Sequence, residues 1–253
     1  RLSENNVMLP VGEGLWGTII GLGDYRLRFA DVQTNQVGFF GTALEEGEES
    51  GLTIRVMYDD AGAITEVEKV VVRQSDSGIK FVNQKWYTKP VLEQMATGQG
   101  SRAEMIALSN GYFDTLQLND GTIRTKFHPD CQRVENGVQT TNNPEFANIV
   151  PVAAMACEDQ FRMGNYRYDD RLRGRRYPLV DEERGLVLAF GFIDHSGKLK
   201  EYQLTDGRTV KSPIHRPHSF YLGELFRIEE GAIKQIEANF ITVPYWMPSP
   251  WDA

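Results

Sequence analysis

The chain has 253 residues, of which 41% are hydrophobic, 25% charged and 11% aromatic. This is the composition of an ordinary globular protein, so disordered, collagen-like and coiled-coil classes are excluded. Thirty-five acidic residues against 27 basic ones give a formal charge of −8, which disfavours nucleic acids and anionic membranes as partners. No apolar run approaches the roughly 18–20 residues that span a bilayer. The opening residues have the pattern of neither a signal peptide nor a transit peptide.

Three segments of the chain recur in the same order, which predicts an internal duplication. Between the copies the offset grows from 131 to 150 and then to 169 residues, so each step adds 19 residues to the second copy. The matching pairs are Ser3–Val7 with Val134–Val138, Asp31–Gly41 with Asp181–Gly191, and Gly62–Glu68 with Gly231–Glu237.

Each copy ends in segments rich in β-branched residues, which are typical of strands. An acidic turn with Gly62 or Gly231, each suited to a positive φ, precedes the last of them. We therefore expect an antiparallel meander in each copy. The predicted strands are Val37–Ala43, Leu52–Tyr58, Ile64–Val72, Gly185–Ile193, Ser219–Arg227 and Ile233–Val243.

Two helices are predicted ahead of the second meander. Ser101 and Glu104 form a capping box, and apolar residues follow at helical spacing up to Leu116. A second helical stretch is expected over Pro144–Arg162, divided or kinked at Pro151. The passage between them, Lys126–Val138, is expected to be irregular or an edge strand.

This order of helix, short extended passage, helix and meander resembles the NTF2-like superfamily, which includes SnoaL-type cyclases, ketosteroid isomerases and scytalone dehydratases. Gly111–Leu116 resembles its first-helix signature, and Phe127–Asn136 resembles the next segment. The resemblance implies an α+β cone, a curved antiparallel sheet packed on helices around a pocket. It implies one partial copy over 1–73, a connection over 74–100, and one complete copy with the pocket over 101–253.

The cysteines and histidines give little support to a metal site, and no metal or cofactor is expected. Cys131 and Cys157 lie 26 residues apart, outside any metal-ligand spacing. They form either one disulfide or, as we favour, two buried thiols of a cytoplasmic protein. No P-loop or GxSxG motif occurs, and Gly21-Leu22-Gly23 follows no clear strand–helix unit.

Three candidate site residues come from the segments that carry the resemblance. Tyr112 lies on the apolar face of the first helix, and the resemblance implies a phenol that donates to a substrate oxygen; the alternative is a core tyrosine. Glu135 stands beside Asn136, where isomerases and cyclases carry an aspartate base. Glu135 is therefore a candidate base and Asn136 a substrate clamp, the alternative for the pair Asn136-Gly137 being a turn.

The segment after the second helix is expected to line the mouth of the pocket. It supplies the candidates Arg162, Tyr166 and Tyr168. The arginines that follow, between 167 and 176, favour a solvated loop paired with Asp169 and Asp170 over a site for an acidic ligand.

Two further candidate groups lie late in the chain. His215 and His218 fall in the second 19-residue insertion, where a lid would let them move protons; the alternative is an exposed loop. The aromatic tail 243–251, with Trp246, is expected to close a pocket or to cross to another subunit.

Within the superfamily, the two-copy layout and the proline-tryptophan ending resemble bacterial γ-formaldehyde lyases of lignin-derived diarylpropanes. This implies a cofactor-independent lyase or dehydratase of aromatic-compound catabolism, which releases formaldehyde from a diol to give a stilbene. Glu135 or a histidine of the 215–218 loop would be the base, and Tyr112 or Tyr166 the acid. The alternatives are a SnoaL-like isomerase, cyclase or hydrolase, and a non-catalytic binding or assembly module. We expect a small hydroxylated aromatic ligand, a homodimer or homotrimer, and an active pocket in the second copy.

Overall fold

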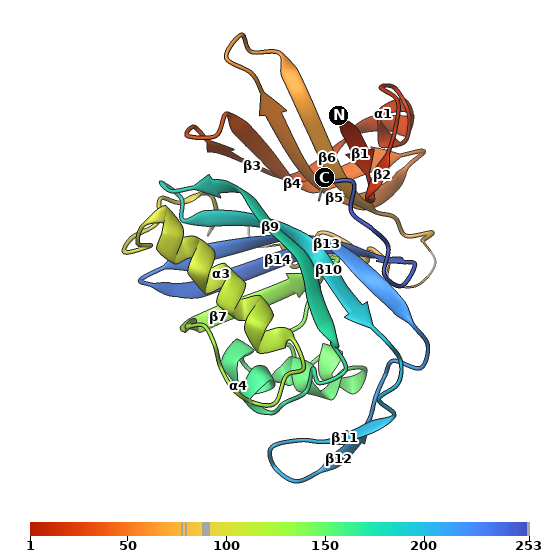
Figure 1. Cartoon of the computed structure of the whole chain (residues 1–253), viewed down its shortest axis with the longest axis vertical. Helices are drawn as coiled ribbons and strands as arrows, with labels where there is room; N and C mark the ends of the chain where they lie inside the picture. Colours follow the sequence, from red (N-terminus) through yellow and green to blue (C-terminus); the bar gives the residue numbers. More distant parts are fainter. Residues whose placement is uncertain (77, 79, 88–91, 252–253) are drawn as a thin grey trace.

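Strands dominate the chain, with 45% of the residues in strands and 14% in helices. The structure is a computed structural model that describes residues 1–76, 78, 80–87 and 92–251, and Figure 1 shows two sheets, one above the other. The predicted α+β cone packed on helices is therefore wrong. The reason is that two six-stranded mixed sheets pack on each other, and the longer helices cover a face of one sheet, whereas among the described residues only the four-residue α1 (Leu15–Thr18) lies on the other.

Sheet A is built from the first 72 residues, and its strand order is β2-β1-β6-β5-β4-β3. Its neighbours are antiparallel except for β1 and β6, which run parallel. Its strands are β1 (Leu2–Glu4), β2 (Val7–Met8), β3 (Ile19–Asp31), β4 (Gln36–Glu45), β5 (Glu48–Tyr58) and β6 (Ile64–Val72).

Sheet B repeats this order as β8-β7-β14-β13-β10-β9, again with one parallel pair, β7 and β14. A separate hairpin of β11 (Glu201–Gln203) and β12 (Thr209–Lys211) lies in the segment between β10 and β13. The strands of sheet B are β7 (Phe127–Glu135), β8 (Val138–Gln139), β9 (Arg171–Asp181), β10 (Leu186–His195), β13 (His218–Glu229) and β14 (Ala232–Val243).

The repeat extends to single hydrogen bonds. Asn5 and Asn136 both have a positive φ, 52° and 46°, in the turn after the first strand of their sheet. The side chain of Asn5 bonds both backbone groups of Val71, at 2.8 and 3.0 Å. Asn136 does the same to Phe240, at 2.9 Å each. Asparagine tolerates this backbone conformation and supplies a donor and an acceptor at once, so both positions are structural.

The helices lie mostly on sheet B. The capping box of Ser101 and Glu104 is confirmed at the start of α3 (Arg102–Leu116). The helical stretch predicted over 144–162 is divided into shorter segments. It forms two 3₁₀ turns, η1 (Phe146–Asn148) and η2 (Pro151–Ala154), and then α4 (Cys157–Arg162). Pro151 begins η2, because proline is accepted in the first turn of a helix but not further in. The short α1 (Leu15–Thr18) lies on sheet A.

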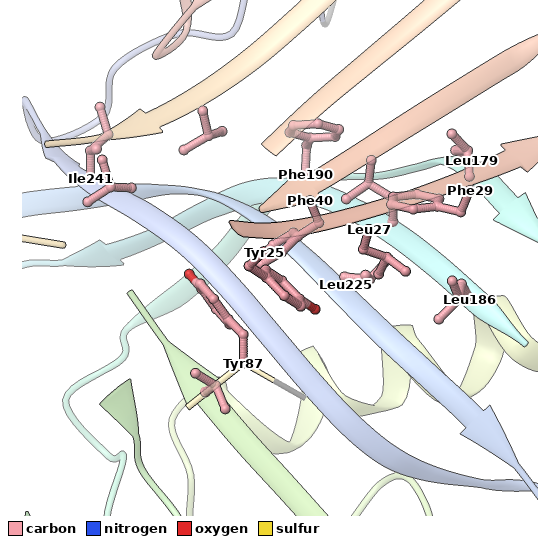
Figure 2. Packing of buried hydrophobic residues seen from close by; sticks show 14 of the residues in the cluster. Tyr25, Leu27, Phe29, Phe40, Tyr87, Leu179, Leu186, Phe190, Leu225 and Ile241 are labelled. Atoms are coloured by element: carbon pink, nitrogen blue, oxygen red, sulfur yellow. The ribbon is translucent and has the colours of Figure 1, made fainter. Parts of the chain in front are cut away.

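The two sheets share one apolar core. Figure 2 shows Tyr25, Leu27, Phe29 and Phe40 of sheet A close to side chains of sheet B such as Phe190. The connection between the sheets contributes to this core. Tyr87 stacks on Tyr25 with a ring separation of 4.6 Å, and Phe81 and Leu92 are also buried there. The mutual burial of these faces holds the sheets together.

A second core lies between sheet B and the helices. The helix α3 contributes Met105, Tyr112, Phe113 and Leu116 to it, and α4 contributes Phe161. Figure 1 shows α3 lying across sheet B, with no comparable helix on sheet A. The order of layers is thus sheet A, shared core, sheet B, second core and helices.

Cys131 and Cys157 are joined in a disulfide that ties β7 to the first residue of α4. The expectation of two free thiols is therefore wrong. Spacing along the chain did not reveal that the second core brings these residues together. Disulfides persist mainly in oxidising compartments, and the cytoplasmic location stays a prediction.

The arginine run is not a solvated loop. It forms β9, and its side chains pair with carboxylates on other elements. Arg173 pairs with Asp194 at 2.9 Å, Arg175 with Asp114 at 2.5 Å, and Arg176 with Glu68 of sheet A.

The aromatic tail returns to sheet A of its own chain. Asn6 donates to the carbonyl of Pro248 at 2.7 Å, and Trp251 donates to Ser3 at 3.2 Å. Within the described residues, no helix is long and apolar enough to cross a membrane.

Candidate acid–base site

One row of residues across sheet B carries two carboxyl groups on the face beneath α3. The strand registers place Glu135 of β7 opposite Ala238, Ala238 opposite Glu224 of β13, and Glu224 opposite Ala189 of β10. Directly opposed residues share a face of the sheet, so both acids point toward the helices. The small alanines that alternate with them leave the carboxyl groups without bulky neighbours in the row.

The helix α3 brings Tyr112 onto this row. The side chain is 1% exposed and is surrounded by the rings of Phe113, Phe127, Phe161 and Phe226, at 5.2 to 6.4 Å. Burial raises the pKa of Glu224, and a side-chain hydrogen bond with Tyr112 opposes part of this rise. Burial raises the pKa of Tyr112 well above its ordinary value, so the phenol keeps its proton.

Arg133, two residues before Glu135 on β7, is the buried cation of the site. It donates to Gln160 of α4 and to the hydroxyl of Tyr166, each at 2.8 Å, and it pairs with Glu135. The guanidinium lies 5.0 Å from the ring centre of Phe161 and 5.1 Å from that of Tyr166. It is held from several sides, which fits a group that orients its neighbours.

Three carboxyl groups interact with this cation, and burial raises the pKa of two of them. Burial raises the pKa of Glu224 to about 8, and the charge of Glu135 adds to the shift while Arg133 opposes it. Burial and the charge of Glu135 also raise the pKa of Asp169 well above its ordinary value. Glu135 is itself paired with Arg133 and keeps 25% of its side chain exposed. At neutral pH the site therefore holds a protonated Glu224 beside the ion pair of Arg133 and Glu135.

Two histidines continue the polar groups beyond Asp169. His195 Nδ1 lies 3.3 Å from the Asp169 carboxyl, and the rings of His195 and His218 are 4.8 Å apart. Burial lowers the pKa of His195 to about 4, so the ring is neutral at physiological pH. Among the described residues its Nε2 has no hydrogen-bond partner.

The structure brings four of the sequence-predicted residues into this group. Tyr112, Glu135 and Tyr166 surround Arg133, and Tyr168 touches Tyr166 at a ring separation of 6.3 Å. The Tyr166 hydroxyl donates to Gln160 at 2.6 Å and accepts from Arg133. Its proton is therefore engaged, which makes Tyr166 a positioning residue. His218 reaches the group through His195, whose ring is 6.2 Å from that of Tyr168.

The other predicted site residues lie elsewhere. Asn136 is committed to the backbone of Phe240. Arg162 is 60% exposed and pairs with Glu158, beside a hollow of about 520 Å³. His215 is exposed in the loop before β13. Trp246 is half exposed over Arg171, with the guanidinium 4.3 Å from its ring centre.

Sequence reasoning missed Arg133, Gln160, Asp169, His195 and Glu224. Two signals were available. Glu224 is a lone acid inside an apolar strand, and Arg133 and Glu135 share a strand face through their i, i+2 spacing.

Sheet A lacks this chemistry at the equivalent places. In the register of the repeat, Glu224 corresponds to Ile54 and Ala189 to Phe39. Glu4, the counterpart of Glu135, pairs with Lys69 and Arg73, each at 3.1 Å. The equivalent place in sheet A thus pairs one acid with two cations and has Ile54 in place of the second carboxyl, so the acid–base group belongs to sheet B alone.

The residues that the structure describes include no group of three or more His, Cys, Asp or Glu arranged to hold a metal ion. A cleft of about 860 Å³ lies not at the acid–base group but on the outer face of sheet A.

A comparison with known protein families matches the part of the chain that forms most of sheet B and its helices. The chain matches no curated protein. One family, described as "Domain of unknown function (DUF8021)", matches residues 98–240, which span α3 through most of β14 and contain every member of the acid–base group. This match covers more than half of the sequence, and the chain belongs to the DUF8021 family.

Proposed function

We propose that the chain is a lyase or dehydratase that acts by acid–base chemistry of its own side chains on a hydroxylated aromatic molecule. The observation that carries the proposal is a buried carboxyl, Glu224, whose pKa is raised to about 8 and which lies in one row with Glu135, the ion-pair partner of Arg133. Titratable groups whose surroundings push their pKa values apart are the arrangement from which acid–base catalysts are built. Here Glu135 is the base, and Glu224 or Asp169 is the acid.

The proposed reaction is an elimination. Glu135 removes a proton from the carbon next to a hydroxyl-bearing carbon, and the electron pair of that C–H bond forms a C=C bond. The hydroxyl group leaves as water with the proton of Glu224 or Asp169. In the diol variant Glu135 takes the hydroxyl proton of a terminal hydroxymethyl group, and the O–H electron pair forms the C=O bond of formaldehyde as the C–C bond breaks. The electron pair of that C–C bond forms the C=C bond, and the other hydroxyl leaves as water with the proton of Glu224 or Asp169. One proton is taken and one is given in each case, and proton exchange between the carboxyl groups restores the site.

The aromatic preference rests on the partly open side of the group. Tyr166, Tyr168, Phe220 and Phe240 are half-buried there, and Phe220 and Phe240 pack at a ring separation of 5.1 Å. Glu135 is the carboxyl of the group with the most exposed side chain. A planar substrate resting on these rings would present its hydroxyl groups to Glu135.

The second candidate is a small-molecule binding module without catalysis. The observation that favours it is the close packing of Tyr112, which touches four rings and leaves little of its own surface open. In such a module Tyr112 would be a core residue and Arg133 a structural cation.

A panel of aryl-substituted alcohols and 1,3-diols, including diarylpropane diols, distinguishes the two. Water-loss products are followed by the absorbance of the new C=C bond, and formaldehyde is assayed separately. For any substrate that turns over, we expect E135Q to lose roughly 10²-fold or more in kcat. The matched control is E158Q, which removes an exposed carboxylate on α4. Binding of panel members without turnover supports the module, and equal rates for E135Q and E158Q contradict the assignment of the base.

A further inference from the structure

The outer face of sheet A is apolar and largely uncovered. The cleft of about 860 Å³ runs over Val37, Phe39, Ile54 and Val56 of β4 and β5. At one end α1 packs Leu15 on this face, and at the other end the turn 182–184 closes the cleft. Large side chains beside it are open to solvent, including Ile20 at 69% and Val32 at 82% exposure. Contiguous apolar surface of this kind marks a place of interaction.

The repeat shows what covers the same face in the second copy. In sheet B the equivalent face lies beneath α3, with Tyr112 and Phe113 against Phe226 at ring separations of 5.2 and 5.6 Å. The strand registers equate the four residues of the cleft with four residues of that face. Val37 corresponds to Val187, Phe39 to Ala189, Ile54 to Glu224, and Val56 to Phe226.

The cation that secures α3 also has a counterpart. Arg175 on β9 binds Asp114 of α3 at 2.5 Å and Asn110 at 3.2 Å. On β9 Arg176 lies opposite Phe190, and on β3 Leu27 lies opposite Phe40, the counterpart of Phe190 in the repeat. Arg176 and Leu27 are therefore equivalent positions. The residues just before them, Arg175 and Arg26, are equivalent in the same way. Arg26 is exposed and donates to the carbonyls of Leu22 and Gly23. In the described part of the chain it has no carboxylate partner.

We propose that the outer face of sheet A is the docking site of an amphipathic α-helix supplied by a partner polypeptide, in the place that α3 takes on sheet B. The helix presents apolar side chains at i, i+3/i+4 and i+7 to the cleft and a carboxylate to Arg26. Ile54 stands where sheet B has Glu224, so the helix carries an apolar side chain, not a phenol, at the position of Tyr112. This inference is independent of the proposed chemistry in sheet B.

The test uses a fluorescent peptide of residues 101–117 that carries Y112F. A lactam between A103K and A107D, both at exposed positions of α3, holds it helical, because free peptides of this length are marginal helices in water. Fluorescence anisotropy with the full chain is expected to show saturable micromolar binding. A peptide of the same composition with the apolar spacing scrambled is expected not to bind.

Matched variants locate the site. V37D charges a partly exposed residue of the cleft and is expected to weaken binding at least about tenfold. I149D charges a more exposed apolar residue of the other half of the chain and is expected to leave binding unchanged. R26Q in the protein and D114N in the peptide are expected to weaken binding several-fold, and together no more than either alone.

Circular dichroism and melting of V37D, R26Q and I149D establish that each variant is folded before titration. The proposal is overturned by a lack of saturable peptide binding, or by binding that V37D does not change. It is also overturned if sedimentation shows a dimer that V37D dissociates, because the occupant of the face would then be a second copy of this chain.

Discussion

The hydroxyl of Tyr25 on β3 donates a 2.6 Å hydrogen bond to the carboxylate of Glu237 on β14, across the core that the two sheets share. Tyr221 of sheet B donates in the same way to Glu68 of sheet A, at 2.5 Å. Glu68 and Glu237 are equivalent in the repeat. Each sheet therefore holds a buried glutamate that a tyrosine of the other sheet satisfies.

Y25F removes one of these donors and leaves the Glu237 carboxyl buried without it. We expect the free energy of unfolding to fall by about 1–3 kcal/mol, the usual cost when a buried charged group loses a hydrogen bond. Chemical denaturation measures the loss, with Y245F, at a more exposed tyrosine, as the control. Equal stability of the two variants would show that the bond contributes nothing to the contact between the sheets.

E224Q changes how stability depends on pH. The pKa of Glu224 is about 8 in the folded chain and lies near its ordinary value when unfolded. The contribution of Glu224 to the free energy of unfolding is therefore fully present below the pKa of the unfolded chain. It is lost as the pH rises toward 8, by about 1.4 kcal/mol per pH unit. Glutamine does not titrate, so we expect E224Q to become progressively more stable than the parent between about pH 5 and pH 8. Denaturant midpoints across this range test it, and a constant difference would contradict a raised pKa.

His195 has the opposite pH dependence. Its pKa falls to about 4 on folding, because burial favours the neutral ring. The stability it contributes is present above the unfolded pKa and is lost as pH falls from there toward 4. H195N is expected to remove part of the acid-side loss of stability, whereas H215N, at an exposed histidine, should not. Parallel acid unfolding of H195N and the parent chain would contradict the shift.

R133Q removes the cation that Glu135, Gln160 and Tyr166 share. A buried ion pair that loses one partner typically costs 3–5 kcal/mol, since the remaining charge is uncompensated. We expect a loss of about this size and a smaller loss in R133Q/E135Q, where neither charge remains. The control is R162Q, whose exposed ion pair is worth about 1 kcal/mol or less. Additive losses in the double variant would show that Arg133 and Glu135 are not coupled.

Reduction of the disulfide loosens the segment around α4. Closing a loop of 26 residues is worth about 3 kcal/mol in the chain-entropy model. We expect a reducing agent to lower the melting temperature of the parent chain but not that of C131A/C157A. Amide hydrogen exchange in residues 144–162 is expected to be faster in the reduced parent chain and in C131A/C157A than in the oxidised parent chain. A melting temperature insensitive to reductant would indicate that the bond is absent or without effect.

The sequence predicted the local features well. Ile64–Val72 is a strand with the predicted bounds, and Ser101 caps α3 as expected. Gly62 and Gly231 take positive φ values of 82° and 69° in their turns. These features depend on neighbouring residues, so patterns of spacing and turn residues reveal them.

The missed features depend on contacts between distant segments. The sequence predicts a solvated loop where β9 lies, because its arginines are charged, whereas Asp114, Asp194 and Glu68 pair with three of them from other elements. The packing of sheet A on sheet B, which replaces the expected cone, likewise depends on side chains more than a hundred residues apart. Glu224 became a candidate only once the strand registers placed it in a row with Glu135.

A titration of Glu224 tests the central claim, that this carboxyl stays protonated at neutral pH beside the ion pair of Arg133 and Glu135. The chain is labelled with ¹³C at the glutamate side-chain carboxyl carbons, and E224Q assigns the resonance of Glu224. We expect this resonance to titrate near pH 8. Titration of Glu224 in the ordinary acidic range would show that this carboxyl is not a protonated acid at neutral pH, and would contradict the account.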